Sequence, residues 1–389
     1  MLGLGTATHK RGGDLRRFYT QQHRCYCGLD LHARSMYVCL VNQAGDILLH
    51  RHMKAAPDPF LKAVAPYRDG LVVAVECRFT WYWLADLCAD EGIPCVLGQA
   101  LSMNAIPGGT ATHDTIDAHK IAALRRGGML PQADVYPAQM RATRDLLRRR
   151  THLMRKRAAL LSHVQPTNSQ YNLSEIGQKI AYKAHRTGVA ERFADPAVQT
   201  TMEVDLSLIT SSDELLQDLE RSLLQTAKHP DAQTLYRRQT VPGMGKILSL
   251  VLLYEIHRLD RFPSVQDFAS YCRLVKGRKE SGGKRLGTSG KKIGNAPLTW
   301  AFSEAATLFL RHTPQGQKLL ARLENKHDKG KALSILAHQL GRAVYVMLKR
   351  KVAFALEMFL QTEESRAGEP GASLDGKGMS LKRARSMSD

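Results

Sequence analysis

Four acidic residues of this chain occupy positions from which they could act together on a phosphodiester. Asp30 and Glu76 each end an apolar segment of strand type, and Asp114 and Asp117 stand three residues apart. An acidic residue at the end of a buried strand is delivered to one edge of a sheet, and two residues at i and i+3 share one helix face. Four like charges brought together require cations, and carboxylate oxygens suit Mg²⁺ or Mn²⁺. Metal held in this way polarises a phosphodiester and activates the group that attacks it.

Each of these residues alone has an ordinary structural interpretation, because a strand-terminal aspartate is often a helix cap or a turn former. The ordered set is more specific. An Asp on one strand, a Glu on a second strand and an Asp-x-x-Asp pair on a helix all fall within one domain-sized stretch. This order favours the catalytic interpretation, with the four residues as metal ligands.

The segments that position these residues alternate between strand and helix patterns. They are predicted strands at 25–30, 35–42, 46–52, 71–76 and 94–97, a predicted helix at about 80–91, and a glycine-bearing loop at 107–109 before the Asp114 helix. Strands 35–42 and 46–52 are predicted to form a hairpin. This order predicts an α/β domain with a mixed sheet flanked by helices.

The composition indicates a polyanionic partner. Lys and Arg number 56 against 36 Asp and Glu, which gives a net charge of +20 and a pI near 9.8. Such a charge favours nucleic acid or an anionic membrane. No segment approaches the roughly 18 apolar residues of a membrane span, and the N-terminus lacks the apolar core of a signal peptide. We therefore expect a cytoplasmic protein without a membrane partner. The 7 cysteines have no metal-type spacing and are predicted to be buried, reduced thiols.

From about residue 137 the pattern changes to long helices. Two seven-residue series, Leu146/Leu153/Leu160 and Leu147/Met154/Leu161, predict a coiled-coil seam, and Ile209/Leu216/Leu223 predict an antiparallel return. The first helix is strongly basic, and Asp145 is nearly the only acidic residue within it, which predicts that its charges are unpaired. This favours contact with a phosphate backbone over a solvated face, through Arg141, Arg144, Arg148, Arg149 and Arg155.

A third region begins at the Pro-Gly-x-Gly-Lys sequence of residues 242–246. The spacing of a nucleotide-binding Walker loop is absent, so ATP binding is not expected. Glycines before an apolar helix resemble the hairpin of a helix-hairpin-helix unit, in which Gly243, Gly245 and Lys246 would meet a phosphate. A plain turn without a ligand is the alternative.

The stretch 278–292 is basic and rich in glycine, and Ser281 lies within it. An exposed serine surrounded by cations could attack a phosphate, and Arg278, Lys284 and Arg285 could hold the phosphate oxygens. Ser289 is the rival nucleophile, and a flexible loop that only touches a backbone is the structural alternative.

These motifs together resemble the insertion-sequence transposases that combine a DEDD RuvC-like domain with a serine-bearing domain. This is insertion-sequence family one hundred and ten, the bridge-RNA-guided recombinases. The resemblance spans about residues 25 to 360 and is carried by Gly28-Leu29-Asp30, Val75-Glu76, the stretch from Asp114 to Ala122, the stretch from Val241 to Gly245, and Ser281-Gly282-Gly283. Phe262-Pro263, the stretch from Tyr271 to Val275, and Gly294-Asn295 also fall where that family's second domain would have them.

The resemblance implies that Mg²⁺ is held by the four carboxylates and that Ser281 forms a covalent link to DNA. It also implies a non-coding guide RNA that pairs with donor and target DNA, a dimer or tetramer, and a nucleoid-associated bacterial protein. The predicted organisation is a flexible basic arm (1–23), an RNase H-like, RuvC-like DEDD domain (24–136), long antiparallel coiled-coil helices (137–232), a mainly α serine-bearing domain with a helix-hairpin-helix-like element (233–361), and a disordered tail (362–389).

The chain departs from the family pattern beside two of the carboxylates. The usual Ala-Thr-Gly-x-Tyr after Glu76 is replaced by the sequence Cys-Arg-Phe-Thr-Trp of residues 77–81, and His113 precedes Asp114 where Lys-Thr is common. Neither change removes a predicted metal ligand. Two further hypotheses are a structure-selective, metal-dependent nuclease that cuts without rejoining and a non-catalytic nucleic-acid-binding protein. The intact carboxylate set argues against the second of these.

Overall fold

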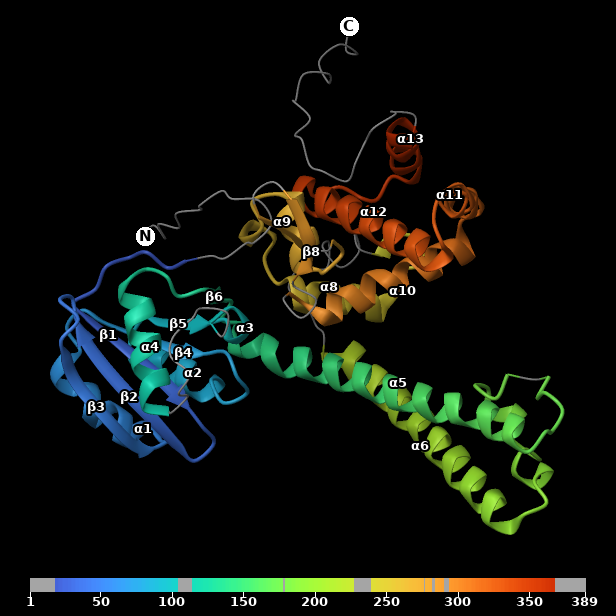
Figure 1. Ribbon diagram of the computed structural model, residues 1–389, viewed down its shortest axis with the longest axis horizontal. Helices are drawn as coiled ribbons and strands as arrows, with labels where there is room; N and C mark the ends of the chain where they lie inside the picture. The colour runs from blue at the N-terminus through green and yellow to red at the C-terminus, as the bar shows by residue number, and fades with distance from the viewer. Residues whose placement is uncertain are drawn as a thin grey trace, which may run out of the picture. The chain divides into compact units, whose positions relative to one another are not determined.

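The computed structural model of the protein describes residues 18–103, 114–177, 179–226, 239–275, 277–281, 284–289 and 294–367 (Figure 1). The chain divides into two compact units. One comprises residues 1–141 and 275–294, and the other comprises residues 142–274 and 295–389.

The first unit is built on a mixed sheet of six strands in the order β3-β2-β1-β4-β5-β6. The strands are β1 (Cys25–Leu31), β2 (Ser35–Asn42), β3 (Ile47–Lys54), β4 (Leu71–Glu76), β5 (Cys95–Gly98) and β6 (Gln132–Ala133). β1 is parallel to β4 and β4 is parallel to β5, whereas β2, β3 and β6 pair antiparallel. The predicted mixed sheet is confirmed, including the hairpin of β2 and β3.

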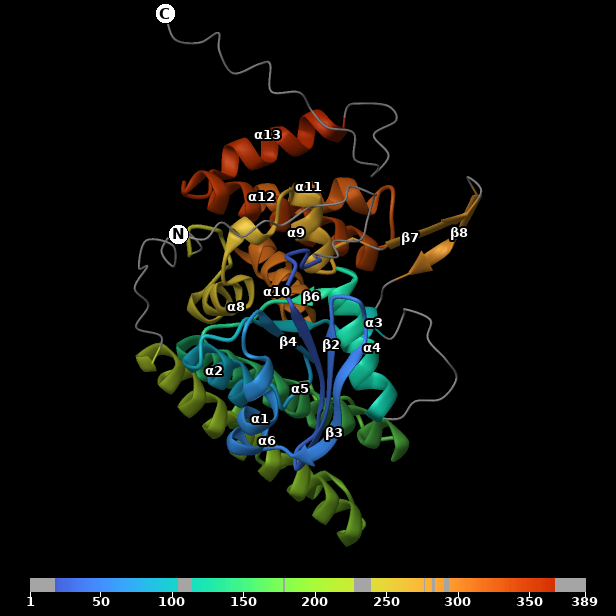
Figure 2. The ribbon, with the colours of Figure 1, turned by 90° about the vertical axis from the view of Figure 1, so that its left-hand side faces the viewer.

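Helices cover both faces of this sheet. Successive side chains of a strand point to opposite faces, and in the buried strands both sets are apolar, so each face requires a covering layer. On one face Cys27 and Leu29 of β1 pack with helices α1 (Pro57–Val64) and α2 (Tyr82–Asp90). On the other face Tyr26 packs with helix α4 (Asp114–Arg126) (Figure 2). The unit also contains the short elements η1 (Ala65–Tyr67) and α3 (Ala100–Met103) and a separate two-stranded sheet of β7 (Gly277–Ser281) and β8 (Lys284–Ser289).

A buried arginine holds the segment before β1 in place. Arg125 of α4 donates to the carbonyl oxygens of Tyr19 and Gln21, and its guanidinium carbon lies 4.0 Å from the Tyr19 ring centroid. Residues 18–23, which the sequence assigned to a flexible arm, are therefore packed against the sheet domain. Residues 1–17 lie outside the described part of the chain.

The second unit contains two long helices that run antiparallel, α5 (Ala138–Gln170, in this unit from Ala142) and α6 (Pro196–Thr226) (Figure 1). Polar contacts join the two helices: the ion pairs of Arg150 with Glu220 and Arg157 with Asp213, and a hydrogen bond between His163 and Asp205. On α6 the buried apolar residues recur every seven positions, at Met202, Ile209, Leu216 and Leu223. Two short turns, η2 (Lys183–His185) and η3 (Ala190–Arg192), lie in the connection.

The rest of the second unit is helical: α8 (Lys246–Ile256), η4 (Leu259–Arg261), α9 (Val265–Tyr271), α10 (Ala296–His312), α11 (Pro314–Glu324), α12 (Lys329–Arg350) and α13 (Leu356–Ala367). Rings of Phe268, Phe302 and Tyr345 pack together between α9, α10 and α12. Helix α13 continues beyond Thr362, where the sequence predicted a disordered tail, and residues 368–389 lie outside the described part.

Two further expectations concern the burial of the cysteines and the absence of a membrane span. All seven cysteines are free, and Cys27, Cys39, Cys88 and Cys272 are buried. Cys25, Cys77 and Cys95 are partly exposed, so the expectation of buried thiols is confirmed for only part of the set. Among the described residues, no helix has the length and apolar character needed to cross a membrane.

Candidate active site

Two of the predicted carboxylates lie side by side at one edge of the sheet. β1 and β4 are parallel, and their register pairs Leu29 with Val75, so the next residues on each strand are Asp30 and Glu76. Both side chains are on the α4 face, since Tyr26 of β1 and Val72 of β4 pack there. Asp30 is 4% exposed and Glu76 is 8% exposed.

Helix α4 brings the third carboxylate to the same edge because it runs antiparallel to β1. Its last residue, Arg126, donates to the carbonyl oxygen of Gln43, which lies beyond the β2 end that pairs with the start of β1. The first turn of α4, with the half-buried Asp117, must then lie toward the Asp30 end of β1. Asp114 begins the helix, and its side chain lies outside the described residues.

Gly28 allows α4 to approach this closely. A Cβ atom at this position would lie 2.2 Å from the carbonyl oxygen of Ala118 and 2.4 Å from the backbone nitrogen of Ala122. Because both are backbone atoms, no side-chain rotation could relieve the contact. Gly28, two residues before Asp30, is therefore required for the packing of α4 against β1.

Each buried carboxylate has a histidine or arginine side chain beside it, from the residue two positions further along the chain. Asp30 Oδ2 lies 3.2 Å from His32 Nε2, and Glu76 Oε2 accepts a hydrogen bond from Arg78 Nε at 2.5 Å. Within the described side chains, no three His, Cys, Asp or Glu residues form a group able to hold a metal ion. The structure thus brings Asp30 and Glu76 together and directs Asp117 toward them.

The loop after Glu76 carries Arg78 and Phe79, which belong to the sequence that differs from the family pattern and were not predicted to be part of the site. It is anchored at both ends, since the Cys77 nitrogen donates to the Gly98 carbonyl at 2.8 Å and Thr80 Oγ1 donates to the Leu31 carbonyl at 2.9 Å. Between these anchors, Arg78 pairs with Glu76, and Phe79 is 82% exposed. An arginine and an exposed aromatic ring thus replace the small residues of the family pattern beside the carboxylates.

The serine-bearing stretch forms a β-hairpin of β7 (Gly277–Ser281) and β8 (Lys284–Ser289). Ser281 pairs with Lys284, which places it at the turn end, and Ser289 pairs with Gly277 at the opposite end. The stretch therefore contains two paired strands in place of the loop, and the role of Ser281 stays a prediction. The side chains of the hairpin, including those of Arg278, Lys284 and Arg285, lie outside the described residues.

The Pro-Gly-x-Gly sequence forms a turn before α8. The Met244 nitrogen donates to the Val241 carbonyl at 3.0 Å, and Gly243 has a φ of +81°, a value that favours glycine. A Cβ at Gly243 would lie 2.5 Å from backbone atoms of α10, so packing also requires glycine there. Gly245 is the N-cap of α8, and Lys246 is exposed. Contact of these residues with a phosphate stays a prediction.

The basic helix α5 differs from its prediction. The expectation that its arginines are unpaired is wrong for Arg141, which pairs with Asp86, and for Arg144 and Arg148, which both pair with Glu255. These partners come from α2 and α8, far along the sequence, so the local scarcity of acidic residues was misleading. Arg149 and Arg155 are exposed. Nucleic-acid binding by α5 stays a prediction and is now best supported for these two.

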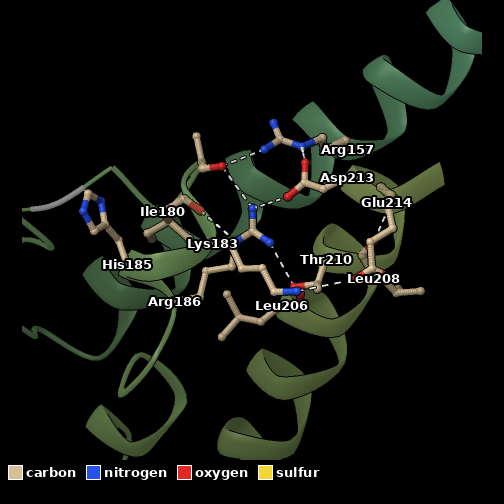
Figure 3. Close-up of polar contacts among 12 residues, drawn as sticks. Arg157, Ile180, Lys183, His185, Arg186, Leu206, Leu208, Thr210, Asp213 and Glu214 are labelled. Atoms are coloured by element: carbon tan, nitrogen blue, oxygen red, sulfur yellow. Dashed lines mark hydrogen bonds and ion pairs between the residues drawn. The ribbon is translucent and has the colours of Figure 1, made fainter. Parts of the chain in front are cut away.

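Basic side chains on and beside the α5–α6 pair are mostly paired with acidic side chains. Arg186 donates to Asp213 and to Thr210 Oγ1, and Asp213 also accepts from Arg157 (Figure 3). Burial alone would raise the pKa of Asp213, but these two arginines outweigh it and hold that pKa below its ordinary value. An open groove of about 460 Å³ beside Arg186 is also lined by Lys183, whose ammonium pairs with Glu214. Few unpaired charges therefore face this groove.

The fold and the carboxylate edge are those of an RNase H-like enzyme that acts on DNA, and comparison with known families agrees. A DEDD-type profile of IS110 transposases matches residues 27–171, and a profile described as "Transposase IS116/IS110/IS902 family" matches residues 237–321. The chain belongs to the IS110 family of insertion-sequence transposases. No curated protein matches it. The first match contains the four carboxylates, and the second contains Ser281.

Proposed function

We propose that this transposase cuts and rejoins DNA through a covalent serine–DNA intermediate, with Mg²⁺ or Mn²⁺ held by Asp30, Glu76, Asp114 and Asp117. The observation that carries the proposal is the meeting of β1, β4 and the first turn of α4 at one sheet edge. Two carboxylates buried side by side repel each other unless a cation lies between them, and their oxygens are suitable ligands. When bound, the metal would supply charge neutralisation at the phosphate and activation of the attacking oxygen.

Ser281 is the proposed nucleophile because it lies at the turn end of its hairpin, next to Gly282. Its Oγ would attack the phosphorus, form a new O–P bond and lose its proton, while the bond to the adjoining sugar oxygen breaks and that oxygen leaves as a hydroxyl. Arg278, Lys284 and Arg285 would hold the non-bridging oxygens. The phosphodiester is conserved in the intermediate, so a second sugar hydroxyl can reverse the reaction and join strands without ATP.

The long helices and the Pro-Gly-x-Gly turn supply the proposed nucleic-acid contacts. Exposed Arg149 and Arg155 would meet a phosphate backbone, which in this proposal belongs to a guide RNA that pairs with donor and target DNA. Gly245 and Lys246 at the start of α8 would act as a helix-hairpin-helix element. The seven-residue burial pattern of α6 supports a coiled coil, and assembly as a dimer or tetramer completes the proposal.

Trapping the intermediate tests this function. Incubation of the protein and its copurified RNA with a nicked suicide substrate should yield a protein–DNA adduct whose modified peptide contains Ser281. Ser281→Ala should give no adduct and Ser289→Ala should retain it, whereas Asp30→Ala or EDTA should abolish cleavage and leave DNA binding largely intact.

The same assay identifies the alternative. Metal-dependent cleavage without an adduct from the wild-type protein would indicate a nuclease that does not rejoin strands. An adduct that survives Ser281→Ala and is lost in Ser289→Ala would move the nucleophile to the other end of the hairpin.

A further inference from the structure

Phe79 is the most exposed of the large apolar side chains that the structure describes. It is 82% exposed and lies in the turn that follows Glu76. Single exposed apolar residues are common on protein surfaces and carry no function by themselves. This ring, however, lies beside the carboxylate edge of an enzyme that acts on DNA. The face of an aromatic ring stacks on a nucleobase of any sequence, so the chemistry of the ring and that of the substrate match.

The turn that carries Phe79 is fixed to the ends of both strands that bear the buried carboxylates. At its start, Arg78 Nε donates to Glu76 Oε2 at 2.5 Å. At its end, Thr80 Oγ1 donates at 2.9 Å to the carbonyl oxygen of Leu31, which ends β1 beside the other carboxylate. Phe79 is three residues from Glu76, so its Cα lies within about 11 Å of the Glu76 Cα.

The residue two positions after Phe79 fixes the chain as it leaves the turn. Trp81 is 5% exposed and packs in the apolar cluster with residues of α1 and α2. The guanidinium carbon of Arg141 lies 4.7 Å from the centroid of the Trp81 ring, and Arg141 is itself paired with Asp86. The exposed ring is therefore carried by a segment that is fixed at both ends. Such a segment loses little further freedom when a ligand binds, so ordering of the loop does not offset the stacking.

We propose that Phe79 stacks on a base of the DNA strand that is cut, next to the phosphodiester held at the carboxylate edge. The proposal rests on the proposed function, which places that bond at Asp30 and Glu76. Bases within a duplex stack on one another, so a side-chain ring meets a base face only where the strand is unpaired or its stack ends. Phe79 would therefore hold an unstacked base beside the bond and fix the register of the strand on the site.

Substitutions at position 79 separate stacking from simple apolar contact. Phe79→Trp keeps a flat aromatic face, whereas Phe79→Leu keeps an apolar side chain without one. Removing an aromatic residue that stacks on a base weakens binding by roughly 5- to 150-fold, so kcat/KM for cleavage should fall at least about fivefold in Phe79→Leu and Phe79→Ala. Phe79→Trp should retain it. Ile47→Ala removes another exposed apolar side chain, at the opposite end of the sheet, and should leave kcat/KM unchanged.

An abasic site in the DNA identifies the partner of the ring. The bond that is cut is mapped from the products of the wild-type protein, and the bases on either side are then removed one at a time. At the stacked position, loss of the base and Phe79→Ala should together cost no more than either change alone. Additive losses at every flanking position would overturn the proposal, as would a wild-type kcat/KM in Phe79→Leu.

Photo-cross-linking in the Asp30→Ala protein separates this proposal from the proposed chemistry, because it requires no cleavage. DNA with 5-iodouracil at successive positions should give, at one position, a cross-linked peptide that contains residue 79. That cross-link should be lost when Phe79→Leu is added and kept when Phe79→Trp is added. Full cleavage by Asp30→Ala would refute the carboxylate chemistry and leave the cross-link to decide the stacking by itself. Metal-dependent cleavage by the wild type without any cross-link at residue 79 would overturn the stacking alone.

Discussion

Replacing Gly28 with alanine should disable the carboxylate edge without removing any carboxylate. The added Cβ would lie 2.2 Å from the carbonyl oxygen of Ala118, whereas real contacts of this kind are essentially never below 3.0 Å. Helix α4 must therefore move away from β1 by about 1 Å, which at a reacting centre costs about a hundredfold in rate. Overpacking of this kind also destabilises a protein by about 1–3 kcal/mol.

Two measurements connect the displacement to the site. Calorimetric titration with Mn²⁺ should show weaker binding in Gly28→Ala, because the first turn of α4 carries Asp114 and Asp117 and moves with the helix. DNA cleavage, measured well below the unfolding temperature, should fall about a hundredfold. DNA affinity should change little, because the proposed phosphate contacts lie elsewhere.

Two control variants separate this effect from lost stability. Leu29→Ala, on the opposite face of β1, should destabilise by about 2–5 kcal/mol yet leave the approach of α4 unchanged. It should therefore retain cleavage while folded. Gly177→Ala adds a Cβ with nothing within 4 Å and should behave as wild type. Wild-type metal affinity and cleavage in Gly28→Ala would refute the reasoning that close approach of α4 builds the site.

Three further predictions concern charged groups. Arg78→Ala should lower the Mn²⁺ concentration needed for half-maximal cleavage, because the guanidinium on Glu76 competes with a cation; an unchanged or raised requirement would argue against that competition. Burial raises the pKa of Glu255, but the hydrogen bond from Arg148 and the charges of Arg144 and Arg148 outweigh it and leave the pKa below its ordinary value. Ionised Glu255 therefore contributes its full stabilisation above the ordinary pKa of glutamate, about 4.3, and this contribution is lost as the pH falls through the lowered pKa. The Tm difference between wild type and Glu255→Gln should accordingly shrink on acidification below about pH 4. Arg149→Ala with Arg155→Ala should reduce the salt dependence of nucleic-acid binding by a slope of roughly 2, whereas Lys183→Ala, whose charge is paired, should change it little.

The strands that carry Asp30 and Glu76 could be predicted from the sequence because their signals are local. An uninterrupted apolar run bounded by polar residues indicates a buried strand, and a carboxylate at its end must lie at a sheet edge. The Asp-x-x-Asp spacing likewise indicates one helix face. The approach of α4 could not be predicted in this way, because it depends on Gly28 and Ala118, which are 90 residues apart and have no local signal for each other.

The hairpin containing Ser281 has a local signal in the sequence. Gly282-Gly283 is a favoured two-residue hairpin connection, and the residues on either side pair as strands in the structure. The abundance of Lys, Arg and Gly instead suggested a loop. The two glycines, which favour a tight turn, therefore predict the hairpin better than the composition of the residues around them does.

The arginines of α5 show why net charge is an unreliable measure of a nucleic-acid surface. A charge of +20 counts Arg144 and Arg148 as fully as Arg149 and Arg155. The structure separates them, because Glu255 neutralises part of the first pair and holds it in a fixed geometry, whereas the second pair is exposed. An arginine bound to a buried carboxylate would have to leave that carboxylate desolvated in order to bind a phosphate, at a cost of several kcal/mol. The arginines that can release counterions on DNA or RNA are therefore those without such partners, and the paired ones hold α5 against α8.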